Sequence, residues 1–162
     1  MTLTIHKGYL PGSIGRITEL HAAYYQQLVA FGCRFESKVA RELSEFCERY
    51  VDERDGLWLA LGNGRVEGSI VIDGLSAQNE GAQLRWFITS NEARGTGIGT
   101  ALLTSALTFC RSRRYERVYL WTFEGLSAAR HLYEKFGFRL VHEQHGARWG
   151  AEVNEQRFEL QA

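Results

Sequence analysis

The segment from Arg94 to Gly99 constrains this chain more than any other part, because it has a glycine at every second position between a strand-like and a helix-like run. Glycine leaves backbone N–H groups unshielded and adopts dihedral angles that other residues resist. The residues that follow, from Thr100 to Leu103, indicate a helix whose first N–H groups are unpaired and whose dipole is positive at that end. Together these groups predict a strand-to-helix turn that holds a phosphate or pyrophosphate.

Two common phosphate-binding motifs do not fit this turn. A P-loop ends in Lys followed by Ser or Thr, and no such Lys precedes Thr100. The dinucleotide-binding motif needs a third glycine three residues after the second, and counting from Gly97 leads to Thr100 instead. ATP hydrolysis and NAD binding are therefore both disfavoured. A glycine-rich turn that serves only packing stays open at this point.

The turn resembles the Arg/Gln-x-x-Gly-x-Gly/Ala signature of the GNAT superfamily of N-acetyltransferases, which it matches at Arg94, Gly97 and Gly99. In that family the corresponding loop binds the pyrophosphate of coenzyme A. The resemblance therefore implies acetyl-CoA as cofactor.

A second segment, from Ala129 to Phe138, resembles the Ala-x-x-Leu-Tyr-x-x-x-Gly-Phe segment of the same family. Its apolar residues fall at helical spacing, Ser127 is suited to cap the helix, and Gly137 is suited to the left-handed position that ends it. The chain departs from the family at Leu126, where members often have an Asn that contacts the cofactor.

The resemblance extends from residue 8 to residue 160 and implies a single acetyltransferase domain over residues 1–162. The expected fold class is α/β (α+β), with a central mixed, mostly antiparallel sheet of six to seven strands, a splayed parallel pair and about four helices. Residues 81–88, 117–138 and 149–160 also look like modules that follow winged-helix regulators of the multiple-antibiotic-resistance type. Since this chain contains no such regulator, a stand-alone version is expected.

Periodicity and turn signals predict the elements individually. The expected strands are residues 3–9, 57–61, 65–72, 82–89, 118–122, 138–143 and 154–160, and the expected helices are residues 13–30, 36–50, 97–112 and 127–136. The right-handed crossover rule makes strands 82–89 and 118–122 parallel neighbours. In the family this pair splays apart, and the amide-containing arm of coenzyme A occupies the gap like an added strand.

The resemblance implies a set of cofactor-binding residues on the splayed strand, in the glycine-rich turn and on the following helix. They are Phe87, Ile88, Thr89, Arg94, Gly95, Thr96, Gly97, Ile98, Gly99, Thr100, Ser127, Arg130 and Tyr133. It also implies direct transfer without an acyl-enzyme, with the oxyanion held by a backbone N–H near Phe87 and Ile88. Tyr133 is the predicted acid that protonates the departing thiolate; a core aromatic is the alternative.

The base that would deprotonate the acceptor amine is less defined. Family members often carry Glu or His on the splayed strand, where this chain has Gln83 and Arg85. Glu124 is the predicted base, against the alternative of a solvated loop carboxylate. A third alternative is an amine that arrives already neutral, with no dedicated base.

Three residues are predicted to bind the acceptor. Arg85 would attract a carboxylate-bearing acceptor and repel a polyamine, unless it pairs with a nearby Glu on the sheet. Tyr24 and Tyr25 share a face of the first helix with His21, and packing is equally compatible with their positions. A small-molecule or peptide amine is the expected acceptor.

Bulk properties exclude several classes of partner. The formal net charge is +0, which gives no reason to expect a nucleic acid or an anionic membrane as a partner. The three cysteines lack Cys-x-x-Cys spacing, and their odd number together with the absence of a signal peptide predicts a cytoplasmic location. No metal site is expected, because His142 and His145 lie three apart in a predicted strand and so face opposite sides.

Two functions from different classes remain open. One is an acetyl-CoA-dependent N-acetyltransferase, and the other is a non-catalytic acetyl-CoA sensor or partner-binding module. A homodimer is left open in both.

Overall fold

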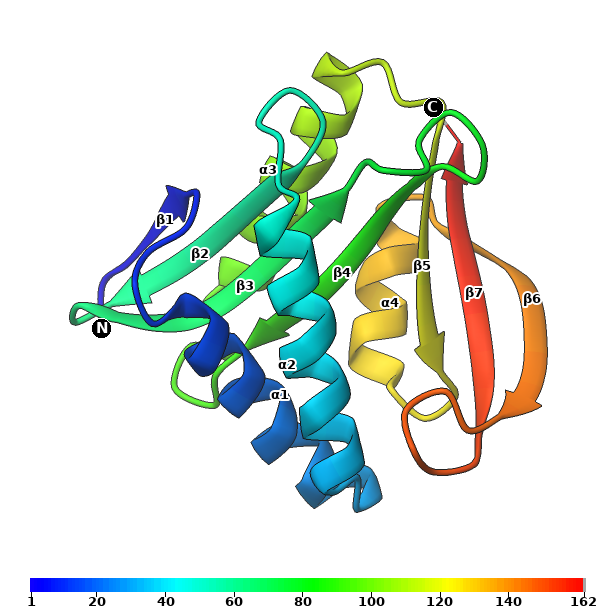
Figure 1. The fold of residues 1–162 in the computed structure, drawn as a ribbon, viewed down its shortest axis with the longest axis horizontal. Coiled ribbons are helices and arrows are strands. Elements are labelled where there is room, and N and C mark those ends of the chain that lie inside the picture. Colours follow the sequence, from blue (N-terminus) through cyan, green and yellow to red (C-terminus); the bar gives the residue numbers. More distant parts are fainter. Residues whose placement is uncertain (162) are drawn as a thin grey trace.

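One sheet runs through the molecule, and the computed structural model describes it over residues 1–161 (Figure 1). Its seven strands lie in the order β1-β2-β3-β4-β5-β7-β6. Their bounds are β1 Leu3–Lys7, β2 Gly56–Gly62, β3 Arg65–Asp73, β4 Ala82–Thr89, β5 Arg117–Phe123, β6 Arg139–Gly146 and β7 Val153–Gln161. Only β4 and β5 pair in parallel, and all other neighbours are antiparallel. The expected mixed, mostly antiparallel sheet is therefore confirmed.

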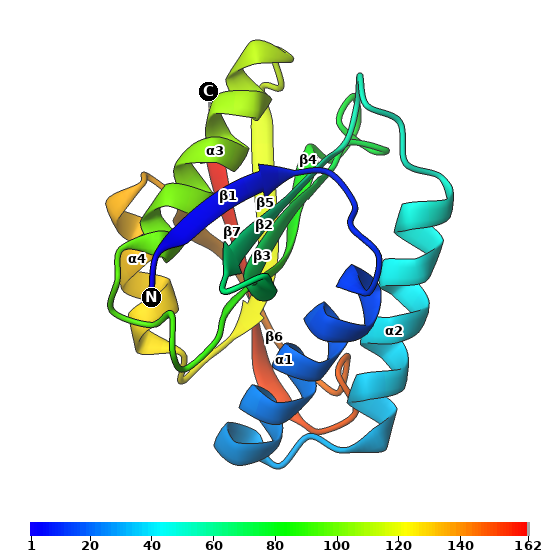
Figure 2. The same ribbon diagram turned by 90° about the vertical axis from the view of Figure 1, so that its left-hand side faces the viewer.

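Four helices cover the two faces of this sheet. They are α1 Ser13–Val29, α2 Cys33–Glu48, α3 Ile98–Ser112 and α4 Ser127–Lys135. Figure 2 shows α1 and α2 on one face and α3 and α4 on the other. None of the helices within residues 1–161 is both long and apolar enough to cross a membrane.

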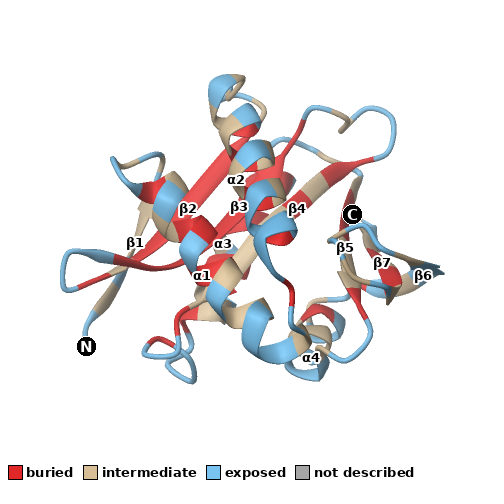
Figure 3. Ribbon diagram, turned by 60° about the horizontal axis from the view of Figure 1, so that its bottom comes forward, coloured by how far each residue is buried: buried red, intermediate tan, exposed pale blue. Residues whose placement is uncertain are grey.

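Alternation along the central strands supplies a core to each face. Leu57, Leu59 and Val71 pack with α1 and α2. Trp58 and Ile70 pack with α3 on the opposite face. Figure 3 shows the buried residues concentrated along β2 and β3, whereas β6 is mostly exposed. The sheet is thus buried on both faces at its centre, and the site lies beside this rigid part.

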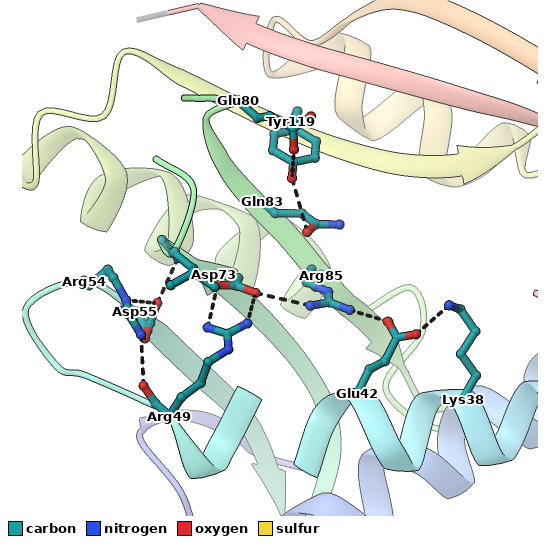
Figure 4. Close-up of polar contacts among 12 residues, drawn as sticks. Lys38, Glu42, Arg49, Arg54, Asp55, Asp73, Glu80, Gln83, Arg85 and Tyr119 are labelled. Carbon is teal, nitrogen blue, oxygen red and sulfur yellow. Dashed lines mark hydrogen bonds and ion pairs between the residues drawn. The ribbon is translucent and has the colours of Figure 1, made fainter. Parts of the chain in front are cut away.

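The parallel pair opens soon after it forms. β4 and β5 pair only through Ala82–Val118 and Gln83–Tyr119. The Tyr119 hydroxyl lies 3.4 Å from Oε1 of Gln83, so side chains also bridge the strands at this closed end (Figure 4). On its other edge β5 continues to pair with β7 as far as Phe123. The splayed pair expected from the sequence is therefore confirmed.

A β-bulge in β4 accompanies this opening. Val71 of β3 is opposite Arg85 and Ser69 is opposite Ile88, so one residue of β3 faces two of β4. Trp86 in the bulge has a φ of 43°, a left-handed value that is uncommon for a bulky residue. The Ser69 hydroxyl donates to the Trp86 carbonyl oxygen at 2.7 Å and so holds the bulge in place.

The helix boundaries correct two details of the sequence reading. The second helix begins at Cys33, three residues before the predicted Glu36. Ser127 is the first residue of α4 rather than its cap; Leu126 is the N-cap, and no side-chain hydrogen bond caps the helix. Gly137, with a φ of 100°, ends α4 as predicted, and the next residue, Phe138, donates its N–H to the Tyr133 carbonyl.

Candidate active site

The glycine-rich turn between β4 and α3 presents several unpaired backbone donors. Gly95 and Gly97 have φ values of 81° and 87°, and Gly97 is the N-cap of α3. Among residues 1–161, no hydrogen bond uses the N–H groups of Gly95, Gly97, Gly99 or Thr100. A Cβ at Gly95 or Gly97 would meet no atom within 4 Å. The left-handed φ values favour glycine at both positions, and the open space beside them leaves room for an anion close to the backbone.

Arg94, at the start of this turn, is held by the turn itself and by α1. Its guanidinium donates to the Thr89 carbonyl at 3.0 Å and to Oδ1 of Asn91 at 2.7 Å. It also lies 4.6 Å from the ring centroid of Tyr24. The contact with Tyr24 joins the glycine-rich turn to the helix on the other side of the sheet.

Tyr133 lies on α4 at the opening between the strands. Its ring is buried against the rings of Phe87, Phe138 and Phe158. Burial raises the pKa of the Tyr133 hydroxyl well above its usual range, so the group remains protonated at neutral pH. No hydrogen bond of the described residues involves this hydroxyl. It therefore has a proton free to donate to a ligand.

A cavity of about 160 Å³ lies next to Tyr133, on the side of α1 and α2. Phe35, Lys38, Val39 and Glu42 of α2 line it at helical spacing. The other walls come from α1, from β4 and β5, and from the segment between β6 and β7. These walls include His21, Tyr25, Gln83, Arg85, Trp86, Phe87, Trp121, Phe123, Arg148 and Trp149.

Charged side chains on one wall of the cavity form a continuous chain of ion pairs (Figure 4). Glu42 accepts from Lys38 through Oε2 and from Arg85 through Oε1, the latter at 2.6 Å. Arg85 also reaches Asp73 at 3.2 Å, and Asp73 pairs with both terminal nitrogens of Arg49. These partners hold the pKa of the Asp73 carboxyl below its usual range despite its burial.

Arg148, in the segment between β6 and β7, is fixed by a carboxylate and an aromatic ring. Its backbone N–H and its Nε both donate to Glu155, at 2.8 and 3.3 Å. Its guanidinium lies 4.0 Å from the ring centroid of Trp121. Donated hydrogen bonds, including one from Gln144, lower the pKa of Glu155 although the residue is buried.

His21 is a neutral group on the cavity wall. It is buried, and burial lowers its pKa to about 4. Its Nδ1–H donates to the Ile17 carbonyl oxygen at 2.8 Å, which leaves Nε2 as an acceptor. The ring stacks on Tyr25, whose own pKa is raised by burial. Both groups are therefore uncharged at neutral pH.

The structure brings together some of the predicted site residues and separates others. Arg85, Phe87, Tyr25 and Tyr133 line the cavity. Tyr24 contacts Arg94 instead. Ser127 and Arg130 lie on α4, where Arg130 pairs with Glu134 at 3.5 Å. Ile88 is buried in β4, next to Thr89 at the end of the strand.

Glu124, the predicted base, is exposed in the turn after β5 and does not line the cavity. One of its carboxylate oxygens accepts from Asn154 at 3.2 Å. Its catalytic role remains a prediction. Within residues 1–161, no group of three His, Cys, Asp or Glu side chains is arranged to hold a metal ion.

Many cavity residues were not predicted from the sequence, among them Lys38, Glu42, Arg148 and Trp149. The α2 pair had a signal, because charged residues at positions 38 and 42 share a helical face with Phe35 and Val39. Arg148 and Trp149 lie in an irregular segment whose path no periodicity defines.

The low pKa of His21 makes stability dependent on pH. Unfolded His21 would titrate near 6.5, so between about pH 6.5 and 4 the unfolded state binds more protons and acid destabilises the folded state. At pH 4.5 this amounts to about 2.5 kcal/mol of lost unfolding free energy. Urea unfolding at pH 7 and pH 4.5 should therefore show a smaller acid loss in His21→Gln. The exposed His131→Gln is the control, and an unchanged loss in His21→Gln contradicts the assignment.

Parts of this sequence are similar to curated proteins. Mycothiol acetyltransferase from Salinispora arenicola is 43% identical over 67 residues, covering 41% of this chain and 19% of that protein. N-acetylaspartate synthetase from Xenopus tropicalis is 29% identical over 120 residues, covering 73% of this chain and 43% of that protein. The chain thus spans less than half the length of these curated relatives.

The fold also matches solved structures over nearly the whole chain. The structure of yncA from Salmonella typhimurium with its cofactor acetyl-CoA superposes with a TM-score of 0.76 at 16% identity, covering 98% of this chain and 93% of that one. The model of the acetyltransferase (GNAT) family matches residues 16–138, which is most of the sequence. The chain therefore belongs to the GNAT family of acetyltransferases.

Proposed function

We propose that this protein is an N-acetyltransferase that uses acetyl-CoA and transfers the acetyl group directly to a primary amine of a small molecule or peptide. The observation that carries this proposal is the opening between β4 and β5, with unpaired glycine-turn donors at one end and a cavity beside it. Membership of the family and the acetyl-CoA found with yncA support the choice of cofactor.

The residues present fit acetyl-CoA. The turn from Arg94 to Thr100 offers unpaired N–H groups and open space for a pyrophosphate. Beyond Gln83, β4 has no partner on the side of β5, so the backbone from Phe87 to Thr89 would bind the amide-containing arm. Ser127, Arg130 and Tyr133 complete the proposed cofactor site from α4.

Bound acetyl-CoA supplies a thioester whose carbonyl carbon the amine attacks. The backbone N–H groups near Phe87 and Ile88 would stabilise negative charge on the carbonyl oxygen. Tyr133 would donate its hydroxyl proton to the departing sulfur atom. Its raised pKa keeps that proton in place until it is needed, and the surrounding aromatic rings fix the position of the Tyr133 ring.

Deprotonation of the acceptor amine is proposed to occur without a dedicated base in the cavity. Glu42 is held by two cations, and His21 is a weak base with a pKa of about 4. Glu124 lies outside the cavity. The amine would therefore enter in its neutral form, and the proton that its nitrogen loses on forming the amide would replace the one that Tyr133 gave to the sulfur.

Cofactor binding can be tested at Gly97. Asp at this position adds a negative charge where the pyrophosphate is proposed to bind. We expect the acetyl-CoA-induced rise in melting temperature to vanish in Gly97→Asp. Gly12→Asp is the matched control, because Gly12 caps α1 on the other face of the sheet with a φ of 88° and equally open space. Equal stabilisation of both variants would rule out the turn as the binding site.

Tyr133→Phe tests the proposed acid. The ring and its packing remain and only the hydroxyl is lost, so the fold should persist. Turnover, measured as thiol release with a panel of amines, should fall about a hundredfold or more while acetyl-CoA affinity changes little. Tyr115→Phe, which removes a hydroxyl bonded to Arg54 outside the cavity, is the control. Parental turnover in Tyr133→Phe would assign Tyr133 to packing, and binding without any thiol release would favour the sensor.

The pH dependence of turnover tests the absence of a base. Because only a neutral amine attacks, the rate should rise with pH up to the pKa of the acceptor. The acidic limb should therefore move when two acceptors with well-separated pKa values are compared. A limb that stays fixed and disappears in Glu124→Gln would identify Glu124 as the base.

A further inference from the structure

We propose that the cavity accepts a small primary amine that also carries a carboxylate, such as an amino acid, and that Lys38 and Arg148 bind this carboxylate. The inference deepens the proposed function, on which it rests, by naming the class of acceptor. It follows from the balance of charge on the cavity walls and from the donors that remain free there.

The ion-pair chain on the α2 side has more cations than anions. Three cations, Arg49, Arg85 and Lys38, share only two carboxylates, Asp73 and Glu42. Arg85 pairs with both carboxylates, and the two terminal nitrogens of Arg49 donate to the two carboxylate oxygens of Asp73. Lys38 ends the chain at the cavity wall with Glu42 as its single partner (Figure 4), so two of its three N–H donors are available to a ligand.

Arg148 offers a second donor, from the segment between β6 and β7. Glu155 occupies its Nε and its backbone N–H, whereas no hydrogen bond of the described residues uses Nη1 or Nη2. The contact with Trp121 fixes the guanidinium plane. A planar guanidinium with free terminal nitrogens suits a carboxylate that accepts two hydrogen bonds.

No other lining group opposes an anion. Glu42 is the one carboxylate among the cavity residues, and both of its oxygens are engaged by cations. His21 is neutral at pH 7. A polyamine would therefore meet net positive charge, whereas a carboxylate would neutralise it.

The rest of the cavity suits a compact apolar group. Phe35, Phe123 and Trp149 belong to one aromatic cluster on its wall. A volume of about 160 Å³ is on the scale that admits one small aromatic ring. An amino acid with an apolar side chain combines this group with the carboxylate and the amine.

This assignment differs from the one made for Arg85 on sequence grounds. Arg85 has two carboxylate partners, at 2.6 and 3.2 Å, so its charge is already compensated. Its role here is to orient Glu42. Lys38 and Arg148, with side chains 29% and 35% exposed, retain donors for a ligand.

The test compares phenylalanine and leucine with their carboxamides, which keep the amine and side chain but lose the negative charge. The measured quantity is the ratio of kcat/KM for the acid to that for the amide, so differences in amine pKa cancel between variants. The wild type should prefer the acids, and Lys38→Gln and Arg148→Gln should each lower the ratio about tenfold. Arg41→Gln, an equal loss of charge on α2 outside the cavity, should leave the ratio unchanged.

A binding measurement separates this inference from the proposed function. Calorimetric titration with N-acetylphenylalanine and its carboxamide requires no turnover, and the carboxylate should bind more tightly in the wild type than in either variant. The inference is overturned if the wild type shows no preference for the carboxylate, or if both variants keep the same preference as the wild type. Absence of both acetyl-CoA binding and thiol release overturns the proposed function, whatever the titration shows. Because Arg148→Gln leaves Glu155 buried without its cation, Lys38→Gln decides the result if the other variant is unfolded.

Discussion

β4 contains one extra residue relative to β3, and the Ser69 hydroxyl holds this bulge by donating a hydrogen bond to the Trp86 carbonyl. Without the bulge, strict alternation would place Arg85 and Trp86 on opposite faces. With it, Arg85 pairs with Glu42 and Trp86 packs against Phe46, so both lie on the side of α2. The left-handed backbone at Trp86 has a conformational cost. The acceptor side of the proposed site depends on this local arrangement, because Arg85 and Trp86 both line the cavity.

The two sides of that opening have different physical character. Backbone N–H groups at the start of α3 form the proposed cofactor side, where side chains contribute little. The acceptor side consists of aromatic rings and ion pairs from α1, α2 and the segment between β6 and β7. Tyr133 lies between them, with a protonated hydroxyl in a ring of aromatic neighbours. Transfer from a thioester is favoured by fixed dipoles near the carbonyl oxygen and by a proton donor near the sulfur.

Hydrophobic periodicity and glycine-marked turns predicted the order of all elements, because they are local signals. The crossover rule predicted the parallel pair, and the resemblance to the acetyltransferase family implied the fold class. Cap chemistry at Ser127 was mispredicted, since Leu126 begins α4 without a side-chain bond. The bulge at Trp86 was not predicted, because apolar and polar residues alternate through Arg85 as they do in a regular strand. Most residues of the acceptor side could not be predicted, because residues such as Glu42 and Arg148 line one cavity only through the tertiary packing of elements that are far apart in the chain.

The proposed cofactor-binding and acceptor-binding residues lie on different elements, and this separation affects how the specificity of such a protein can change over generations. The cradle at Gly95 and Gly97 belongs to β4 and α3, whereas the residues proposed to choose the acceptor belong to α2 and to the segment around Arg148. Substitutions at Lys38 or Trp149 alter neither the glycine backbone nor the core beneath α3. A lineage with this architecture can therefore explore new acceptors while its hold on the acyl donor stays intact.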